Sequence, residues 1–317
     1  MNGEVILGID TSNYTTSVAI MDTDGELIAN IKRPLPVKAG ERGLRQSDAV
    51  FAHIKNIPSA MEEARAYLNG ASVVAVGVSE RPRNVDGSYM PCFLTGVAVA
   101  ESVATTKSVP IYKFSHQCGH IMAALYSSGR VDLLDREFCA FHVSGGTTEV
   151  LRVNKSGSAF AAELVAGTAD INAGQLIDRV GVHMGLPFPA GPHIERLALE
   201  NETKLPSVKL KTNDCKVNLS GVENLAISLF DKTGDSRLVS AYVLNYVAKA
   251  LSLLASAYEE RFGSTEFVFA GGVMSNSIIK SALAKQFNAS FATPACSADN
   301  AVGIACLAMR AYNSENK

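Results

Sequence analysis

Short apolar runs alternate along the chain with longer stretches of helical periodicity. The apolar runs of four to six residues predict strands at 5–9, 17–21, 73–78, 139–143, 148–153 and 267–270. Apolar positions at helical spacing predict helices at 49–68, 93–106, 121–126, 173–184, 238–261 and 302–312. Strands that alternate with helices are typical of an α/β chain with parallel or mixed sheets.

Three glycine- or hydroxyl-rich turns interrupt this pattern. They lie at Asp10–Asn13, at Ser144–Thr147 and at Gly271–Asn276, and the third leads into a helical pattern through Phe287. The unit strand–turn–strand recurs near residues 10 and 145, which predicts two related lobes. A single such turn is typical of a hairpin. Three of them, two rich in hydroxyls, favour a phosphate-binding role and a nucleotide between the lobes, although neither GxGxxG nor a P-loop is present.

Composition narrows the class of protein. With 317 residues the chain has room for about two domains. Its net charge of −2 excludes a polybasic nucleic-acid binder. Six scattered cysteines without a CxxC pair indicate reduced thiols. We expect a cytoplasmic protein without a membrane partner, because no apolar run approaches about 18 residues and no secretion signal opens the chain.

The pair His116 and His120 carries candidate metal chemistry. Ser115 is a plausible N-cap, so the two histidines are expected at i and i+4 on one helical face, where both imidazoles can reach one ion. Such a pair is more often ordinary packing or capping, and it lacks the glutamate that a zinc protease uses as general base. A third ligand has to come from elsewhere, and Asp299, just before the last helix, is the best candidate. Its alternative role is to cap that helix. The other histidines (His53, His142, His183 and His193) are expected to be structural or surface groups.

Several motifs together resemble the TsaD/Gcp family. In chain order they are HQCGH (116–120), VSGGTT (143–148), FAGGVMSN (269–276) and SADNAVGIA (297–305). The segments AVFAHIKNIPSAMEEA (49–64) and AGQLIDRVGVHMGLPFPAGPHIERLA (173–198) are also similar to family segments. The resemblance spans nearly the whole chain, and the combination is specific although each motif alone is not.

The resemblance implies an ASKHA fold, with two actin-like lobes around a nucleotide cleft. Residues 1–115 plus 298–317 would form the N-terminal lobe, and residues 116–297 the C-terminal lobe. The implied reaction transfers a threonylcarbamoyl group from threonylcarbamoyl-AMP to N6 of adenosine 37 in tRNA, with partner proteins of the same machinery. The implied ligands of one Fe²⁺ or Zn²⁺ ion are His116, His120 and Asp299. Nucleotide and substrate contacts are expected at Val143, Ser144, Gly145, Gly146, Thr147, Asp178, Gly191, Glu195, Gly272, Asn276 and Asp10.

The chain also departs from the family pattern. Thr147 stands where histidine is usual, and acidic positions are lost in the segments 10–16 and 170–175. These losses leave open a divergent paralogue that binds nucleotide without catalysis. A second alternative is an ASKHA kinase or ATPase in which Asp10 orients magnesium, although magnesium prefers oxygen ligands to histidine. The stretch with Lys204, Lys209, Lys211 and Lys216 is only modestly basic, so tRNA affinity is expected to depend on partners.

Overall fold

Two mixed β-sheets organise the molecule. The computed structural model describes residues 3–12, 14–36, 44–157, 159–207, 210–212 and 215–316. The first sheet has the strand order β3-β2-β1-β4-β5, and the second has the order β11-β10-β6-β7-β8-β9. The first contains β1 (Glu4–Thr11), β2 (Thr15–Asp22), β3 (Leu27–Pro34), β4 (Ser72–Arg81) and β5 (Ile111–Ser115). The second contains β6 (Phe138–Val143), β7 (Thr148–Ser156), β8 (Ala159–Thr168), β9 (Lys216–Val217), β10 (Phe267–Ala270) and β11 (Ala289–Phe291).

The two sheets repeat one topology. In the first, β1, β2 and β3 form an antiparallel meander, and β4 and β5 extend it parallel to β1. In the second, β6, β7 and β8 form the meander, and β10 and β11 extend it parallel to β6. The expectation of an α/β chain with two related lobes is therefore confirmed. The assignment of the lobe boundaries to residues 115/116 and 297/298 stays a prediction.

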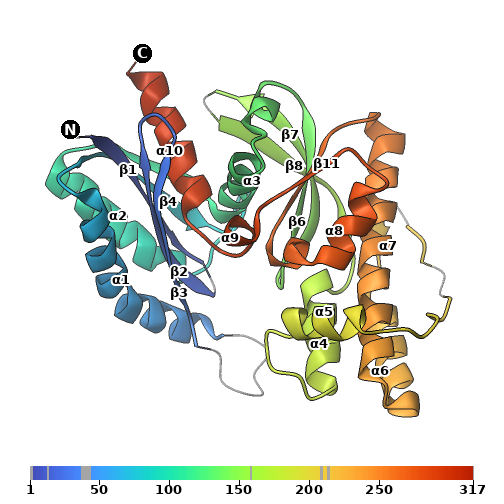
Figure 1. Cartoon of the computed structure of the whole chain (residues 1–317). Helices are drawn as coiled ribbons and strands as arrows, with labels where there is room; N and C mark the ends of the chain where they lie inside the picture. Colours follow the sequence, from blue (N-terminus) through green and yellow to red (C-terminus); the bar gives the residue numbers. More distant parts are fainter. Residues whose placement is uncertain are drawn as a thin grey trace.

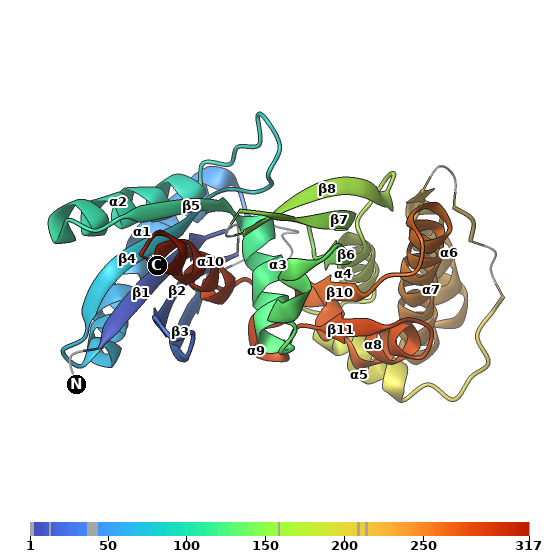
Figure 2. The ribbon, with the colours of Figure 1, turned by 90° about the horizontal axis from the view of Figure 1, so that it is seen from above.

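A pair of helices lies between the sheets, as Figures 1 and 2 show. They are α3 (His116–Ser127) and α10 (Val302–Glu315), and one hydrophobic core joins them to β2, β6 and β10. The first sheet is covered on its other face by α1 (Gln46–Leu68) and α2 (Phe93–Lys107). The far face of the second sheet packs against the remaining large helices: α4 (Ala173–His183), α5 (Gly191–Leu199), α6 (Ser220–Thr233), α7 (Ser236–Phe262) and α8 (Ser277–Ala284).

Two glycines let α3 and α10 approach closely. A Cβ added at Gly303 would overlap the carbonyl oxygen of Gly119 and would stand 2.7 Å from the amide nitrogen of Ala123. The helix backbones therefore touch at this crossing. Because α3 begins at His116 and α10 follows Asp299, the crossing brings the sequence-distant candidate ligands to one place.

Most predicted elements are present with shifted ends. The predicted turn at residues 10–13 is shorter than expected, because Asp10 and Thr11 still pair with Ser17 and Thr16 in the β1–β2 ladder, and Asn13 lies outside the described residues. The pattern did not reveal the edge strands β3 and β5. These strands are only partly buried, and lysine or arginine interrupts the apolar residues of each.

The helix α7 corrects one expectation from the sequence. Among the described helices it alone is long and apolar enough to cross a membrane, with a mean hydropathy of 1.5 over its most apolar window, whereas no such run was expected. That window is 72% buried inside the protein, where α7 packs against α5, α6 and α8. Protein packing thus accounts for its apolar character. The six cysteines are free thiols, as expected.

Candidate metal and nucleotide site

The first turn of α3 presents two histidines on one face. Ser115 caps the helix as expected, because its Oγ accepts a hydrogen bond from the Cys118 amide at 3.2 Å. His116 and His120 follow at i and i+4, and their Nε2 atoms stand 3.0 Å apart. Both side chains are largely buried, and the two rings meet edge to face. The helical spacing that the sequence indicated therefore places both imidazole nitrogens at one point.

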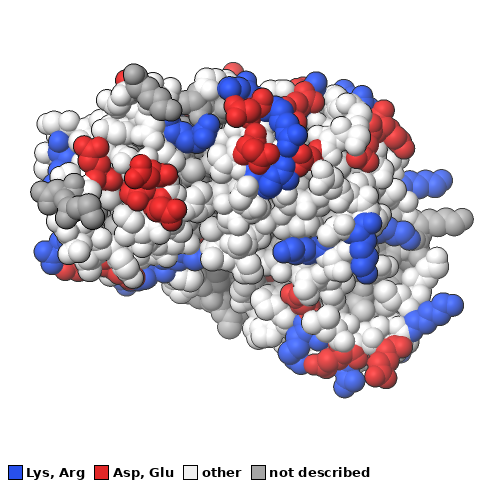
Figure 3. All heavy atoms as spheres, turned by 45° about the horizontal axis from the view of Figure 1, so that its top comes forward, with Lys and Arg blue, Asp and Glu red and all other residues white. Residues whose placement is uncertain are grey.

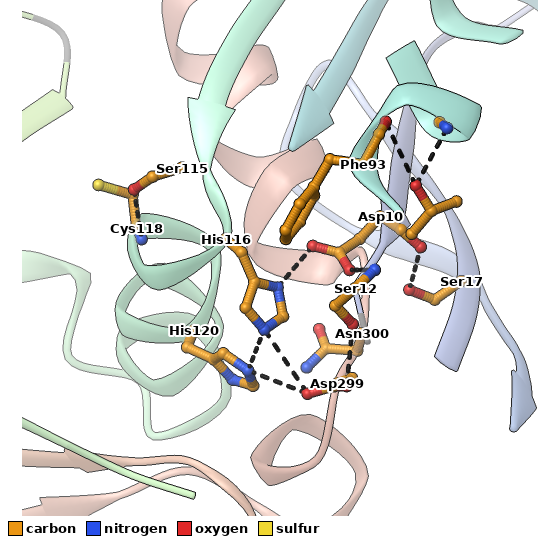
Figure 4. Close-up of polar contacts among 12 residues, drawn as sticks. Asp10, Ser12, Ser17, Phe93, Ser115, His116, Cys118, His120, Asp299 and Asn300 are labelled. Atoms are coloured by element: carbon orange, nitrogen blue, oxygen red, sulfur yellow. Dashed lines mark hydrogen bonds and ion pairs between the residues drawn. The ribbon is translucent and has the colours of Figure 1, made fainter. Parts of the chain in front are cut away.

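Asp299 reaches the same point from the segment between α9 (Pro294–Ser297) and α10. Its Oδ1 lies 3.6 Å from Nε2 of His116 and 3.3 Å from Nε2 of His120 (Figure 4). Its Oδ2 accepts a hydrogen bond from Ser12 Oγ at 2.8 Å. Asp299 does not cap α10. The next residue, Asn300, accepts a hydrogen bond from the Val302 amide through its side-chain oxygen.

The spacing of these three donor atoms fits a transition-metal ion. Zinc binds histidine nitrogen and carboxylate oxygen at about 2.0–2.2 Å, so the edges of a tetrahedral site measure about 3.3 Å. The observed triangle has sides of 3.0, 3.3 and 3.6 Å. Two imidazoles and one carboxylate also suit Fe²⁺. The three side chains can thus hold one divalent ion and leave a fourth position open.

A second carboxylate lies behind His116. Asp10 is completely buried, and its Oδ2 accepts a hydrogen bond from Nδ1 of His116 at 2.7 Å, while Oδ1 accepts from the Ser12 amide at 2.9 Å. Burial alone lowers the pKa of His116, but the carboxylates of Asp10 and Asp299 outweigh it and raise that pKa to about 10. Burial raises the pKa of Asp10, but the His116 imidazolium outweighs this effect and holds it below its ordinary value. Without a metal, His116 therefore carries the positive charge of the site.

Two further histidines are held neutral. Burial, and then the charge on His116, lowers the pKa of His120. Burial lowers the pKa of His142 well below its ordinary value, and His120 and His116 add to the effect. The His142 ring centroid lies 4.7 Å from that of His120 and 6.4 Å from that of His116.

The sequence interpretation placed His142 among structural or surface groups, and so missed its contact with the site. The alternation of side chains along β6 could have revealed this contact. Phe138 and Ala140 face the core that contains α3, and the side chain two residues further along β6 points the same way. The earlier interpretation does hold for His53, which is buried between Thr16 Oγ1 and the Ser12 carbonyl, and for His183, which pairs with Asp231.

The turn Ser144–Thr147 joins β6 to β7 beside this cluster. The Ser144 amide donates to the Thr147 carbonyl at 2.8 Å, and the two hydroxyls are 2.9 Å apart. Asn172, the N-cap of α4, donates from Nδ2 to the Gly146 carbonyl at 2.9 Å. A Cβ at Gly174 would stand 2.5 Å from the Ser144 carbonyl oxygen, so only glycine lets α4 approach the turn this closely. The turn and the N-terminus of α4 thus form one unit.

The remaining predicted contacts gather around α5 and α8. Glu195 accepts hydrogen bonds from the amide and the hydroxyl of Ser277, next to Asn276. The side-chain oxygen of Asn276 caps α8 by accepting from the Ile278 and Ile279 amides. Asp178 on α4 accepts from the Ala190 amide, immediately before Gly191, and burial raises its pKa despite this bond. A Cβ at Gly271, the neighbour of Gly272, would overlap the Val143 carbonyl, which ties this group to the Ser144–Thr147 turn. Asp10 is the exception, because it lies behind His116 and not in this group.

Comparison with known proteins gives a consistent result. The family model TsaD, described as tRNA N6-adenosine threonylcarbamoyltransferase, matches residues 31–306. Relatives with that name include those of Streptococcus suis strain 05ZYH33, 29% identical over all of this chain and 95% of theirs, and of Bacillus licheniformis, 28% identical over 89% of this chain and 83% of theirs.

Solved structures share the fold at low sequence identity. Full-length HypF in its phosphate- and nucleotide-bound form has a TM-score of 0.59 at 14% identity, over 98% of this chain and 46% of its own. A ROK family glucokinase from Streptomyces griseus has a TM-score of 0.53 at 14% identity, over 96% of this chain and 99% of its own. These likenesses establish the ASKHA fold. Since the family model covers most of the chain, the protein belongs to the TsaD family of tRNA N6-adenosine threonylcarbamoyltransferases.

Proposed function

We propose that this protein transfers the threonylcarbamoyl group of threonylcarbamoyl-AMP to N6 of adenosine 37 in tRNA, with one Fe²⁺ or Zn²⁺ ion held by His116, His120 and Asp299. The observation that carries the proposal is the convergence of these three donors in a chain of the TsaD family. Transfer forms a bond from N6 to the carbonyl carbon, breaks the bond from that carbon to AMP, and releases one proton from the amine. No side-chain nucleophile is required.

The chain's own groups prepare the site for this reaction. A bound divalent ion supplies Lewis-acid stabilisation of the negative charge on the departing phosphate. Asp10 accepts a hydrogen bond from Nδ1–H of His116, which leaves Nε2 as the atom able to bind metal. The Ser12 hydroxyl donates a hydrogen bond to Oδ2 of Asp299, and Oδ1 remains directed at the two histidines. The Ser144–Thr147 turn between β6 and β7 would receive the phosphate, and the carboxylates of Asp178 and Glu195 would accept hydrogen bonds from ribose hydroxyls.

In this proposal the chain binds tRNA in the cytoplasm together with partner proteins. Figure 3 shows a face on which acidic and basic side chains lie side by side, without a continuous basic area. Many cations are paired, for example Lys155 with Asp135. Lys204, Lys211 and Lys216 are exposed in or beside the segment between α5 and α6, and Lys209 lies outside the described residues. A few loop lysines supply little phosphate affinity, which supports a partner-dependent subunit.

The contacts of Asp10 count against the kinase alternative. An ASKHA kinase needs a free carboxylate for magnesium, but both Asp10 oxygens accept hydrogen bonds here, one of them from His116. Steady ATP hydrolysis that requires magnesium and ignores iron or zinc would favour that alternative nonetheless. A protein that binds AMP and metal but never modifies tRNA would identify the non-catalytic paralogue.

The test is complementation of a strain that lacks the tRNA modification, read by mass spectrometry of tRNA nucleosides. The wild-type gene should restore N6-threonylcarbamoyladenosine, while His116→Ala and Asp299→Ala should not. His183→Ala is the matched control, because this histidine pairs with Asp231 away from the donors. Purified protein should also contain one transition-metal ion per chain. Restoration by His116→Ala, or the lack of any bound transition metal, would contradict the metal-assisted reaction.

A further inference from the structure

A buried carboxylate lies next to the proposed site but belongs neither to the metal donors nor to the nucleotide contacts. Glu149, on β7 two residues beyond the Ser144–Thr147 turn, is only 7% exposed. Its Oε2 accepts a hydrogen bond from Gln117 Nε2 at 2.6 Å, and its Oε1 lies 3.0 Å from Nη2 of Arg83. A buried carboxylate is costly unless it is paired and hydrogen-bonded, so its presence here calls for an explanation.

The two partners of Glu149 come from the ligand helix and from the first sheet. Gln117 follows His116 in the first turn of α3 and is 4% exposed. Its backbone amide donates to the Pro82 carbonyl at 3.0 Å. Arg83, the next residue, lies in the segment that joins β4 to α2. Glu149 therefore ties β7 of the second sheet to α3 and to a segment of the first sheet.

The segment between β4 and α2 starts and ends at the first turn of α3. Pro82 lies at its start and accepts the hydrogen bond from the Gln117 amide. Phe93, the first residue of α2, has its ring centroid 5.9 Å from that of His116. The segment is thus fixed to the ligand helix at both ends, and Arg83 connects it to β7.

Each half of the proposed site is built without Glu149. The three metal donors come from α3 and from the segment before α10, and the two helices touch at Gly303. The Ser144–Thr147 turn is held by Asn172 and by the close approach of α4 at Gly174. Neither set of contacts joins the donors to the turn, whereas the contacts of Glu149 run between these two parts.

An ordinary stabilising ion pair is the alternative role for this cluster. The Arg83 side chain is 43% exposed, and an ion pair with such a partner adds little stability. Apolar residues of similar volume often stabilise a protein as well as a buried ion pair does. Charge-assisted hydrogen bonds are directional, however, and they add geometric specificity. The cluster therefore suits precise placement better than it suits general stabilisation.

We propose that Glu149 is a positioning residue that holds α3 and its metal donors in register with the Ser144–Thr147 turn, through Gln117 and Arg83. The inference rests on the proposed function, in which one phosphate contacts both the ion and the turn. Groups that act together on one ligand have to be held to within about 0.5 Å. Metal and nucleotide should therefore strengthen each other's binding, and this coupling should depend on Glu149.

The test measures the coupling between Zn²⁺ and AMP by calorimetry. Zn²⁺ should tighten AMP binding to the wild type about tenfold or more, and Glu149→Leu should reduce this factor to about threefold or less. Binding of either ligand alone should stay within about twofold of wild type, because each half-site is intact. Glu149→Gln, which keeps an acceptor for Gln117 but no charge for Arg83, should give an intermediate factor. The matched control Glu137→Gln removes the carboxylate that pairs with Arg152 on the same strand, and it should keep the wild-type coupling.

A distance measurement tests the placement without either ligand. Spin labels at Lys55→Cys on α1 and Lys249→Cys on α7, two exposed positions, report the separation of the two halves. Cys215→Ser removes the partly exposed native thiol, and the other five cysteines are buried. The labelled protein with Glu149 should give one narrow distance distribution, and Glu149→Leu should broaden it. If Glu149→Leu does not fold, Glu149→Gln and Arg83→Gln carry both measurements.

The outcomes separate this inference from the proposed function. Wild-type coupling in Glu149→Leu, an equal loss of Zn²⁺ binding on its own, or an unchanged distance distribution would overturn the inference and leave the proposed function intact. Wild-type protein that binds Zn²⁺ and AMP without any coupling would also overturn the inference. Wild-type protein that binds no transition metal would overturn the proposed function, and the inference with it.

Discussion

Replacing Asp10 by asparagine tests the electrostatic arrangement of the site most directly. The substitution preserves the shape of the side chain, so the amide oxygen can still accept from the Ser12 amide, as Oδ1 does now at 2.9 Å. The amide NH₂ then faces Nδ1 of His116, where a carboxylate oxygen accepted a proton at 2.7 Å. His116 has to accept there, and its own proton moves to Nε2, the atom directed at the other donors.

The magnitude follows from the pKa of His116. The rise from the ordinary value of 6.5 to about 10 corresponds to about 5 kcal/mol in favour of the charged ring, because one pKa unit is about 1.4 kcal/mol. Asp10 and Asp299 share this effect, and Asp10 is its larger source. Asp10→Asn should therefore lower the free energy of unfolding of the metal-free protein by about 3 kcal/mol at pH 7. Because it forces the wrong tautomer, it should also weaken zinc binding about ten- to a hundredfold.

The pH dependence gives the sign of the effect. A raised histidine pKa contributes stability that is fully present below pH 6.5 and is lost as the pH rises through about 10. The difference between wild type and Asp10→Asn, measured by urea unfolding of metal-free protein, should therefore shrink between pH 7 and pH 10. Asp24→Asn, which removes an exposed charge, is the control. A difference that is the same at both pH values, or zinc affinity within twofold of wild type, would refute this reasoning.

Three further predictions concern the charge on His116 and the two close glycine approaches at Gly174 and Gly303. Metal binding at pH 7.5 should release about one proton from His116, so the calorimetric heat of binding should depend on the ionisation enthalpy of the buffer. For the same reason the metal affinity should rise with pH until about pH 10. Binding heats that do not depend on the buffer would contradict this prediction. Gly174→Ala should weaken AMP binding at least tenfold, because the added Cβ would meet the Ser144 carbonyl. The control Gly221→Ala has open space around the new Cβ and should bind AMP as the wild type does. Equal AMP binding by both variants would exclude the close approach of α4 to the turn. Gly303→Ala should lower the free energy of unfolding by about 3 kcal/mol or more, because the added Cβ would push α10 away from α3. The same displacement should reduce the metal content of the purified protein. A variant with normal thermal stability would show that the helix crossing is not tight.

The amino-acid sequence determined much of the architecture on its own. Apolar runs and helical periodicity identified the central strands, the helices α1, α2, α4, α7 and α10, and the repeated strand–turn–strand unit that became two sheets of one topology. Local rules suffice there, because an apolar pattern reports which face of an element is buried. The same rules located the His116–His120 pair and its Ser115 cap, since both depend on helical spacing alone.

Only the tertiary structure decided how these pieces combine. The approach of Asp299 to the histidines depends on the crossing of α3 and α10, which joins residues almost 180 positions apart in the sequence. Asp10 had been expected among the nucleotide contacts or on magnesium, yet it stands behind His116 because β1 ends beside the start of α3. His142 appeared unremarkable in the sequence, and its place beside His120 emerged from the packing of β6 on α3. Periodicity fixes which way a side chain points, but only the packing of distant elements fixes what it meets.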